Sequence, residues 1–145
     1  MKDATPYPVI NTMLAEWVEG LRRLLGKNIV GLYLSGSLAC GDFVPERSDI
    51  DLQAVVRSPL TQDELRSVEQ LHREIERRCP QCANRIECSY VPLQLMLELR
   101  PPAIPRPWWG FGTLCAEAPV GNEWIINHYL LFKHGIRLAG LTSTI

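Results

Sequence analysis

The sequence lacks the features that would assign it to a membrane, to a nucleic acid or to secretion. None of its apolar runs approaches the roughly 20 residues of a membrane-spanning helix. Basic and acidic side chains nearly balance, with 15 Lys and Arg against 16 Asp and Glu, and no basic patch favours nucleic-acid binding. Residues 1–13 lack the long apolar core of a signal peptide. We therefore expect a cytoplasmic protein that binds neither nucleic acid nor membrane.

The five cysteines do not form a regular pattern either. An odd number at irregular spacing argues against the disulfide framework of a small secreted protein. Cys79 and Cys82 form a C-x-x-C pair, which can be a redox pair or half of a zinc site. However, the pair closes a charged helical pattern instead of opening a helix, and Cys88 and Cys115 do not supply a second ligand pair by their spacing. We therefore favour ordinary thiols.

Two amphipathic helices are predicted from apolar spacing. The chain of 145 residues suits one domain with one core. Residues 10–25 repeat apolar side chains at helical spacing, and Gly26 follows as a C-cap. Thr61 and Glu64 form a capping box that opens a second helix over 61–79, which carries one apolar face with the core histidine His72.

Strands alternate with these helices. Apolar runs predict strands over 28–36, 49–56 and 84–91. The prolines within 99–112 predict a loop that contains the pair Trp108-Trp109. A helix over 122–135 and a short strand over 136–141 complete the chain. This order predicts an α/β or α+β domain, and we take it as α+β with a small mixed sheet flanked by helices.

Two carboxylates open the second predicted strand. Residues two apart on a strand share a face, so Asp49 and Asp51 are expected to point the same way, with Cα atoms roughly 7 Å apart. Ile50 and Leu52 would then point to the core. Converging carboxylates repel each other unless a cation lies between them, and oxygen ligands of this kind suit Mg²⁺.

A Gly-Ser turn precedes these carboxylates. Gly36 allows a sharp bend and a close approach of the backbone to a ligand. Backbone N–H groups and the Ser37 hydroxyl can then bind phosphate oxygens, especially if a short helix begins at 37–41. Carboxylates that hold a metal opposite a phosphate-binding turn are what phosphoryl transfer from a nucleoside triphosphate requires.

Glu87 is the candidate for a third carboxylate. It lies in the third predicted strand between the inward-facing Ile86 and Cys88, and therefore on the ligand-facing side with Arg85 and Ser89. If this strand pairs with the second, Glu87 comes near the two aspartates. It can then bind metal or accept the proton of an attacking hydroxyl.

These residues carry a family resemblance. Gly36-Ser37, eleven intervening residues and the sequence Asp-Ile-Asp-Leu at 49–52 resemble the signature of polymerase-β-like nucleotidyltransferases. Residues 32–56 are similar to aminoglycoside adenylyltransferases of the streptomycin/spectinomycin type, which have a similar Tyr-x-x-Gly-Ser turn and Ser-Asp-Ile-Asp-Leu. Residues 85–91 resemble the third strand of that family, and 134–141 the stretch that closes its nucleotidyltransferase domain.

The resemblance implies a mechanism and a site. Asp49 and Asp51 would hold Mg²⁺ on ATP, and Gly36 and Ser37 would bind the triphosphate. Glu87 would be the third metal-binding carboxylate and would activate the acceptor hydroxyl. AMP would pass to a small molecule such as an aminoglycoside, with release of pyrophosphate, which is an antibiotic-resistance activity.

The resemblance also sets the domain organisation and leaves alternatives open. Residues 1–145 correspond to a nucleotidyltransferase domain, without the second, helical domain that follows it in the family. A minimal nucleotidyltransferase that modifies a protein partner, as antitoxin-like members do, is one alternative. A truncated or inactive nucleotide-binding domain is another.

Overall fold

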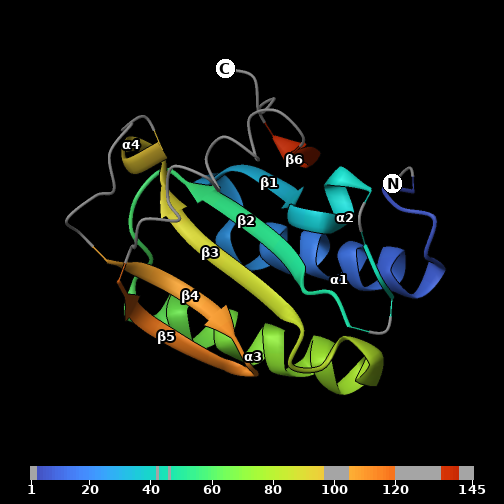
Figure 1. Cartoon of the computed structure of the whole chain (residues 1–145). Coiled ribbons are helices and arrows are strands. Elements are labelled where there is room, and N and C mark those ends of the chain that lie inside the picture. Colours follow the sequence, from blue (N-terminus) through green and yellow to red (C-terminus); the bar gives the residue numbers. More distant parts are fainter. Residues whose placement is uncertain (1–2, 42, 46, 97–104, 120–134, 141–145) are drawn as a thin grey trace.

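A six-stranded mixed β-sheet forms the centre of the fold (Figure 1). The computed structural model describes residues 3–41, 43–45, 47–96, 105–119 and 135–140. The helices and 3₁₀ turns are α1 (Pro8–Leu25), η1 (Gly26–Asn28), α2 (Gly36–Cys40), α3 (Gln62–Arg78), η2 (Pro80–Cys82) and α4 (Leu93–Met96). The strands are β1 (Ile29–Ser35), β2 (Ile50–Val56), β3 (Ile86–Pro92), β4 (Arg106–Gly110), β5 (Thr113–Ala118) and β6 (Ile136–Gly140). No helix in these ranges is long and apolar enough to cross a membrane.

The strands lie in the order β5-β4-β3-β2-β1-β6. The β2–β3 pair is parallel, and the other four pairs are antiparallel. A parallel pair needs a crossover connection, which α3 supplies between β2 and β3. The predicted α+β fold with a mixed sheet flanked by helices is confirmed.

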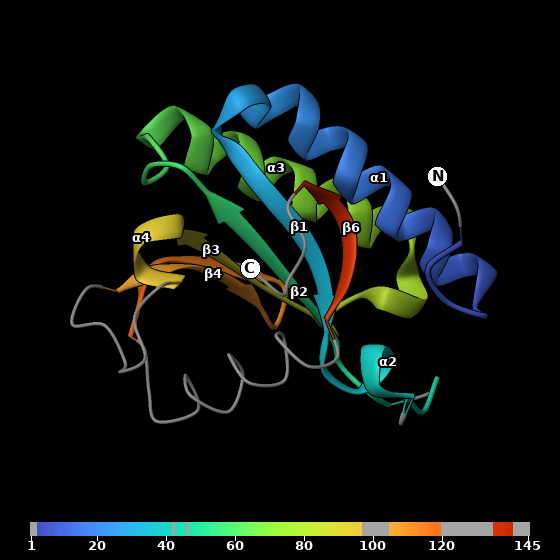
Figure 2. The ribbon, with the colours of Figure 1, turned by 90° about the horizontal axis from the view of Figure 1, so that it is seen from above.

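The two long helices cover one face of the sheet, as Figure 2 shows for α1 and α3. The end of α1 is the predicted one, because Gly26 follows it with φ +52°. The capping box of α3 is also confirmed, since Thr61 Oγ1 accepts from Glu64 N at 3.1 Å and Glu64 Oε1 accepts from Thr61 N at 2.9 Å. The apolar faces of both helices are buried against the sheet, which leaves its other face for a site.

Polar side chains within this core are hydrogen-bonded to one another. His72 Nε2 lies 2.6 Å from the hydroxyl of Tyr90, which also accepts from Trp17 Nε1 at 3.3 Å. Complete burial lowers the pKa of His72 to about 3, so the imidazole is neutral at physiological pH. Trp109 Nε1 donates to the buried carboxylate of Glu76 at 2.6 Å. The prediction of a core histidine at His72 is confirmed.

Strand β4 corrects the predicted loop over 99–112, which is wrong for residues 106–110. Pro107 has no N–H for a ladder bond, but the β4–β5 register shifts between Arg106 and Trp108, and such bulges tolerate proline. The partner strand β5 was not predicted at all. β6 confirms the short strand expected over 136–141. Apart from residue 135, the helix expected over 122–135 lies outside the described residues.

The C-x-x-C pair is also different from expectation. Cys79 and Cys82 form a disulfide bond, whereas we favoured ordinary thiols. The helix α3 ends just before Cys79, and the η2 turn brings the two Cα atoms to 5.4 Å, within the usual range for a disulfide. Cys88 is a free buried thiol and Cys115 a free exposed one.

Candidate active site

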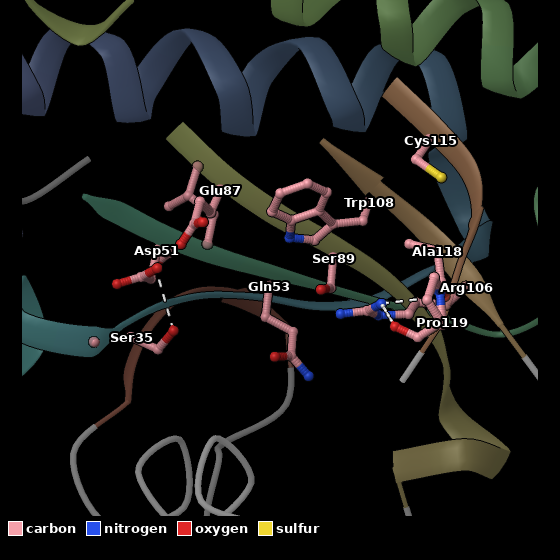
Figure 3. A pocket seen from close by; sticks show the side chains of 12 residues that line it. Ser35, Asp51, Gln53, Glu87, Ser89, Arg106, Trp108, Cys115, Ala118 and Pro119 are labelled. Atoms are coloured by element: carbon pink, nitrogen blue, oxygen red, sulfur yellow. Dashed lines mark hydrogen bonds between the residues drawn. The ribbon is translucent and has the colours of Figure 1, made fainter. Parts of the chain in front are cut away.

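A cavity of about 600 Å³ lies on the sheet face opposite α1 and α3 (Figure 3). Five adjacent strands supply its polar and aromatic wall: Ser35 from β1, Asp51 and Gln53 from β2, Glu87 and Ser89 from β3, Arg106 and Trp108 from β4, and Cys115 from β5. Gly36 contributes at the start of α2. Strand alternation explains the set, because the neighbouring residues of β2 and β3 point into the core.

Asp51 and Glu87 face each other in this cavity. They are register partners in the parallel β2–β3 pair, and Figure 3 shows their carboxylates close together. Burial raises the pKa of Asp51 from 3.8 to about 7, helped by a hydrogen bond with Glu87 and by the negative charges of Glu87 and Asp49. The expected pairing of the two strands is confirmed, and it holds two carboxylates at hydrogen-bonding distance.

Gly36 is required by its contact with Asp51. Its φ of +65° is in the region that favours glycine, and a Cβ at this position would lie 2.8 Å from Asp51 Cγ and closer still to Oδ2. The backbone bend therefore lies directly against the carboxylate. The backbone of Asp51 is also held by the residue before this glycine, because Ser35 Oγ donates to the Asp51 carbonyl oxygen at 3.4 Å.

Ser37 is the second residue of α2, so the short helix expected near 37–41 is present one residue earlier. The Ser37 side chain is half-buried and is not part of the cavity wall. The Gly-Ser turn thus has the predicted bend and helix start. Its backbone N–H groups at the start of α2 have no earlier helical carbonyl to bond, which suits contact with an anion.

Asp49 is placed differently from Asp51 and Glu87. It stands one residue before β2, is exposed, and does not line the cavity. Its negative charge is the weakest of the four causes that raise the pKa of Asp51. In the part of the chain that the structure describes, no three His, Cys, Asp or Glu side chains converge as a metal-binding group. Of the predicted trio, the structure brings together Asp51 and Glu87.

The donor set nevertheless fits a hard cation. Carboxylate oxygens are the ligands that Mg²⁺ prefers, and it needs only one or two of them besides water and phosphate. Among the residues that the structure describes, no Lys or Arg forms an ion pair with Asp49, Asp51 or Glu87. A cation here would favour the charged form of Asp51, which burial and then the neighbouring Glu87 and Asp49 disfavour.

Arg85 does not share the ligand-facing side with Glu87 and Ser89, so that expectation is wrong. It precedes β3, where strand alternation does not yet apply. Its guanidinium donates to the carbonyl oxygens of Ser48 and Gln81 and does not line the cavity.

The tryptophan pair divides between core and cavity. Trp109 is 1% exposed and belongs to the core, whereas Trp108 lines the cavity two strands from Asp51. A Cβ on Gly110 would overlap the Trp108 indole, so this glycine gives the ring room to lie along β4. The sequence pattern suggests an acceptor site or a partner surface as alternatives for the Trp108-Trp109 pair but favours ordinary loop packing, and it gives no sign of Arg106, because all three fall in the predicted loop. Gln53 was detectable, because it alternates with Leu52 on β2.

Comparisons with known proteins agree with this geometry. The model of the nucleotidyltransferase domain family matches residues 14–96, which include β1, the Gly-Ser turn, Asp49, Asp51 and Glu87. No curated protein matches the chain. A solved structure described as spectinomycin adenyltransferase AAD(9) from Enterococcus faecialis with ATP and spectinomycin is similar, with a TM-score of 0.71 and 23% identity. The similarity covers 89% of this chain and 55% of that one, so this chain spans about half of its length. The fold is that of a polymerase-β-like nucleotidyltransferase, and the chain belongs to the nucleotidyltransferase domain family.

Proposed function

We propose that this chain transfers AMP from Mg·ATP to a hydroxyl of a small molecule such as an aminoglycoside, with release of pyrophosphate. The observation that carries the proposal is the pair Asp51 and Glu87, held in register inside a cavity that Gly36 borders. The family membership supports nucleotidyl transfer. The similar structure with ATP and spectinomycin supports the choice of nucleotide and of acceptor class.

The proposed metal site consists of Asp49, Asp51 and Glu87. Bound Mg²⁺ would neutralise charge on the triphosphate oxygens as pyrophosphate leaves. Asp51 lies directly against Gly36 of the Gly-Ser turn and is assigned to binding the metal ion. Asp49 is exposed and approaches from the residue before β2.

Gly36 and Ser37 are assigned to the triphosphate. The absence of a side chain on Gly36 leaves the backbone open beside Asp51. The first N–H groups of α2 and the Ser37 hydroxyl are donors that can orient phosphate oxygens near the carboxylates. Their contribution is to position the α-phosphorus for attack and to bind developing charge.

Glu87 is assigned to the proton of the acceptor hydroxyl. The hydroxyl oxygen forms a bond to the α-phosphorus, the bond from this phosphorus to the pyrophosphate oxygen breaks, and the hydroxyl proton moves to a Glu87 carboxylate oxygen. The neighbouring wall supports a ring-shaped acceptor, since the Trp108 indole and the Ser89 hydroxyl lie along the same cavity.

Pyrophosphate release measured with ATP, Mg²⁺ and a panel of aminoglycosides tests the proposal. Release with an acceptor should fall by at least a hundredfold in Asp51→Asn and Glu87→Gln, because each change removes a carboxylate from the reacting centre. Glu19→Gln is the matched control, since Glu19 is exposed on α1. Transfer that persists in both site variants would refute the assignment. Mg·ATP binding without release on any acceptor would refute the small-molecule part alone.

A further inference from the structure

The side chain of Arg85 reaches the residue immediately before Asp49. Its Nε and Nη2 donate to the carbonyl oxygen of Ser48 at 3.0 and 2.7 Å. Two donors of one planar guanidinium on one carbonyl oxygen fix the direction of that carbonyl. The peptide plane that leads into Asp49 is therefore held from one side.

The backbone of Arg85 holds the residue immediately after Asp49. Ile50 N donates to the Arg85 carbonyl oxygen at 2.8 Å. A single residue thus bonds both chain neighbours of Asp49, Ser48 through its side chain and Ile50 through its backbone. Because Asp49 lies just outside β2, these bonds restrict the backbone dihedral angles that set the direction of its side chain.

Arg85 is itself well anchored. Its N–H donates to Cys82 O at 3.0 Å and its Nη1 to Gln81 O at 3.0 Å, both in the η2 turn that the disulfide closes. Its guanidinium carbon lies 5.6 Å from the centre of the Phe43 ring. The guanidinium is thus engaged by carbonyl oxygens and an aromatic ring on the side away from the active-site cavity.

We propose that Arg85 is a positioning residue that fixes Asp49 for metal binding, a role that rests on the proposed function. Asp49 is exposed and lies outside the paired residues of β2, so its carboxylate needs an external constraint to approach the ion that Asp51 would bind. Some residues orient a metal ligand without contacting the metal themselves. Removing such a residue typically lowers the metal affinity by about 10- to 100-fold.

The sign of the effect separates this role from simple electrostatics. Removing a positive charge near a cation site should strengthen cation binding if charge alone mattered. Loss of the constraint on Asp49 should weaken it instead. Arg85→Met therefore should weaken Mn²⁺ binding about tenfold or more. Arg85→Lys keeps the charge but not the two-donor fork, and should also weaken it.

The experiment measures Mn²⁺ bound to the full chain by the loss of the free-ion electron paramagnetic resonance signal, with a non-hydrolysable ATP analogue present. Arg57→Met is the matched control, because Arg57 Nε also donates to a carbonyl, Lys27 O at 2.8 Å, at the other end of β2. It should bind Mn²⁺ as wild type does. Asp49→Asn should weaken binding at least as much as Arg85→Met.

A metal-free measurement accompanies this one. Hydrogen exchange of the peptide that spans residues 47–51 should be faster in Arg85→Met than in wild type or Arg57→Met. Circular dichroism and thermal melting confirm that each variant is folded. Raising Mg²⁺ should restore much of the transfer rate in Arg85→Met, which a misfolded core would not permit.

The outcomes are distinct. Weaker Mn²⁺ binding together with faster local exchange in Arg85→Met supports the proposal. Unchanged or tighter Mn²⁺ binding in a folded Arg85→Met, or unchanged local exchange, overturns it even if the enzyme is active. A wild type that binds no Mn²⁺ with the analogue refutes the proposed function, and with it this role. Wild-type binding that Asp49→Asn does not weaken refutes the assignment of Asp49 and this role, while leaving the rest of the site intact.

Discussion

Replacing Asp51 by Asn should stabilise the metal-free protein at neutral pH while abolishing nucleotidyl transfer. The pKa of Asp51 is raised from 3.8 to about 7, first by burial and then by Glu87 and Asp49. The folded protein therefore keeps a proton on this carboxyl between about pH 4 and 7, where the unfolded chain has lost it. The stabilisation from this proton is complete below about pH 4 and is lost as the pH rises through about 7.

The size of the effect follows from the same pKa. A change from 3.8 to about 7 corresponds to about 4 kcal/mol, at about 1.4 kcal/mol for each factor of ten in the ionisation constant. The side chain is half-buried and keeps some contact with water, so about 2–4 kcal/mol is expected. Asparagine has nearly the same shape and carries no charge, so it should retain the packing against Gly36.

Urea unfolding in EDTA, followed by tryptophan fluorescence between pH 4.5 and 8, measures this difference. As the pH rises, the free energy of unfolding should fall less in Asp51→Asn than in wild type. At pH 8, Asp51→Asn should be the more stable protein. The exposed Glu19→Gln should follow wild type throughout. Adding Mg²⁺ and ATP should stabilise wild type but not Asp51→Asn, which reverses the order. Equal pH slopes for wild type and Asp51→Asn would refute the reasoning.

Two further predictions concern the bend and the tryptophan pair. Gly36→Ala should lower the free energy of unfolding by about 2–3 kcal/mol and weaken ATP binding measured by calorimetry. The cost of a side chain at a left-handed φ adds to the cost of the overlap between the new Cβ and the Asp51 carboxylate. Gly41→Ala should cost only about 1–2 kcal/mol, since its φ is also positive at +86° but an added Cβ would meet no atom within 4 Å beyond its chain neighbours among the described residues. Trp109→Phe should lose about 1.5–3 kcal/mol in urea unfolding, because buried Glu76 loses its indole donor. Trp108→Phe, in the cavity wall, should lose less than about 1 kcal/mol; equal losses in the two tryptophan variants would contradict the assignment of Trp109 to the core.

Residue patterns were sufficient to predict the parts of the site that depend on local rules. The Gly36 bend follows from glycine chemistry, and α3 follows from the Thr61–Glu64 box. The pairing of Asp51 with Glu87 follows from alternation once β2 and β3 are adjacent. Each of these inferences uses residues within a few positions of one another, or one assumption about strand pairing.

The errors arose where long-range pairing decides the structure. Pro107 predicts a loop by itself, and only the bulge between β4 and β5 makes a strand possible. The sequence pattern places Asp49 in the second strand, but β2 begins one residue later, at Ile50. The N–H of Ile50 donates to the carbonyl oxygen of Arg85. The Cys79–Cys82 bond depends on the turn after α3, which spacing alone does not determine.

The register of β2 against β3 explains how the protein tolerates two adjacent carboxylates. A slip of β2 by one residue would separate Asp51 from Glu87 and relieve their repulsion, which is only a part of the cost of about 2–4 kcal/mol that burial and the neighbouring carboxylates together impose on the charged Asp51. The same slip would move Ile50 and Leu52 of β2 from the core to the cavity face, and these side chains are at most 4% exposed. Burial of each contributes about 1.5–3 kcal/mol, so their sum exceeds the repulsion. Core packing therefore holds the carboxylates together in the free protein, and the unfavourable charge they share is available to favour a cation when one binds.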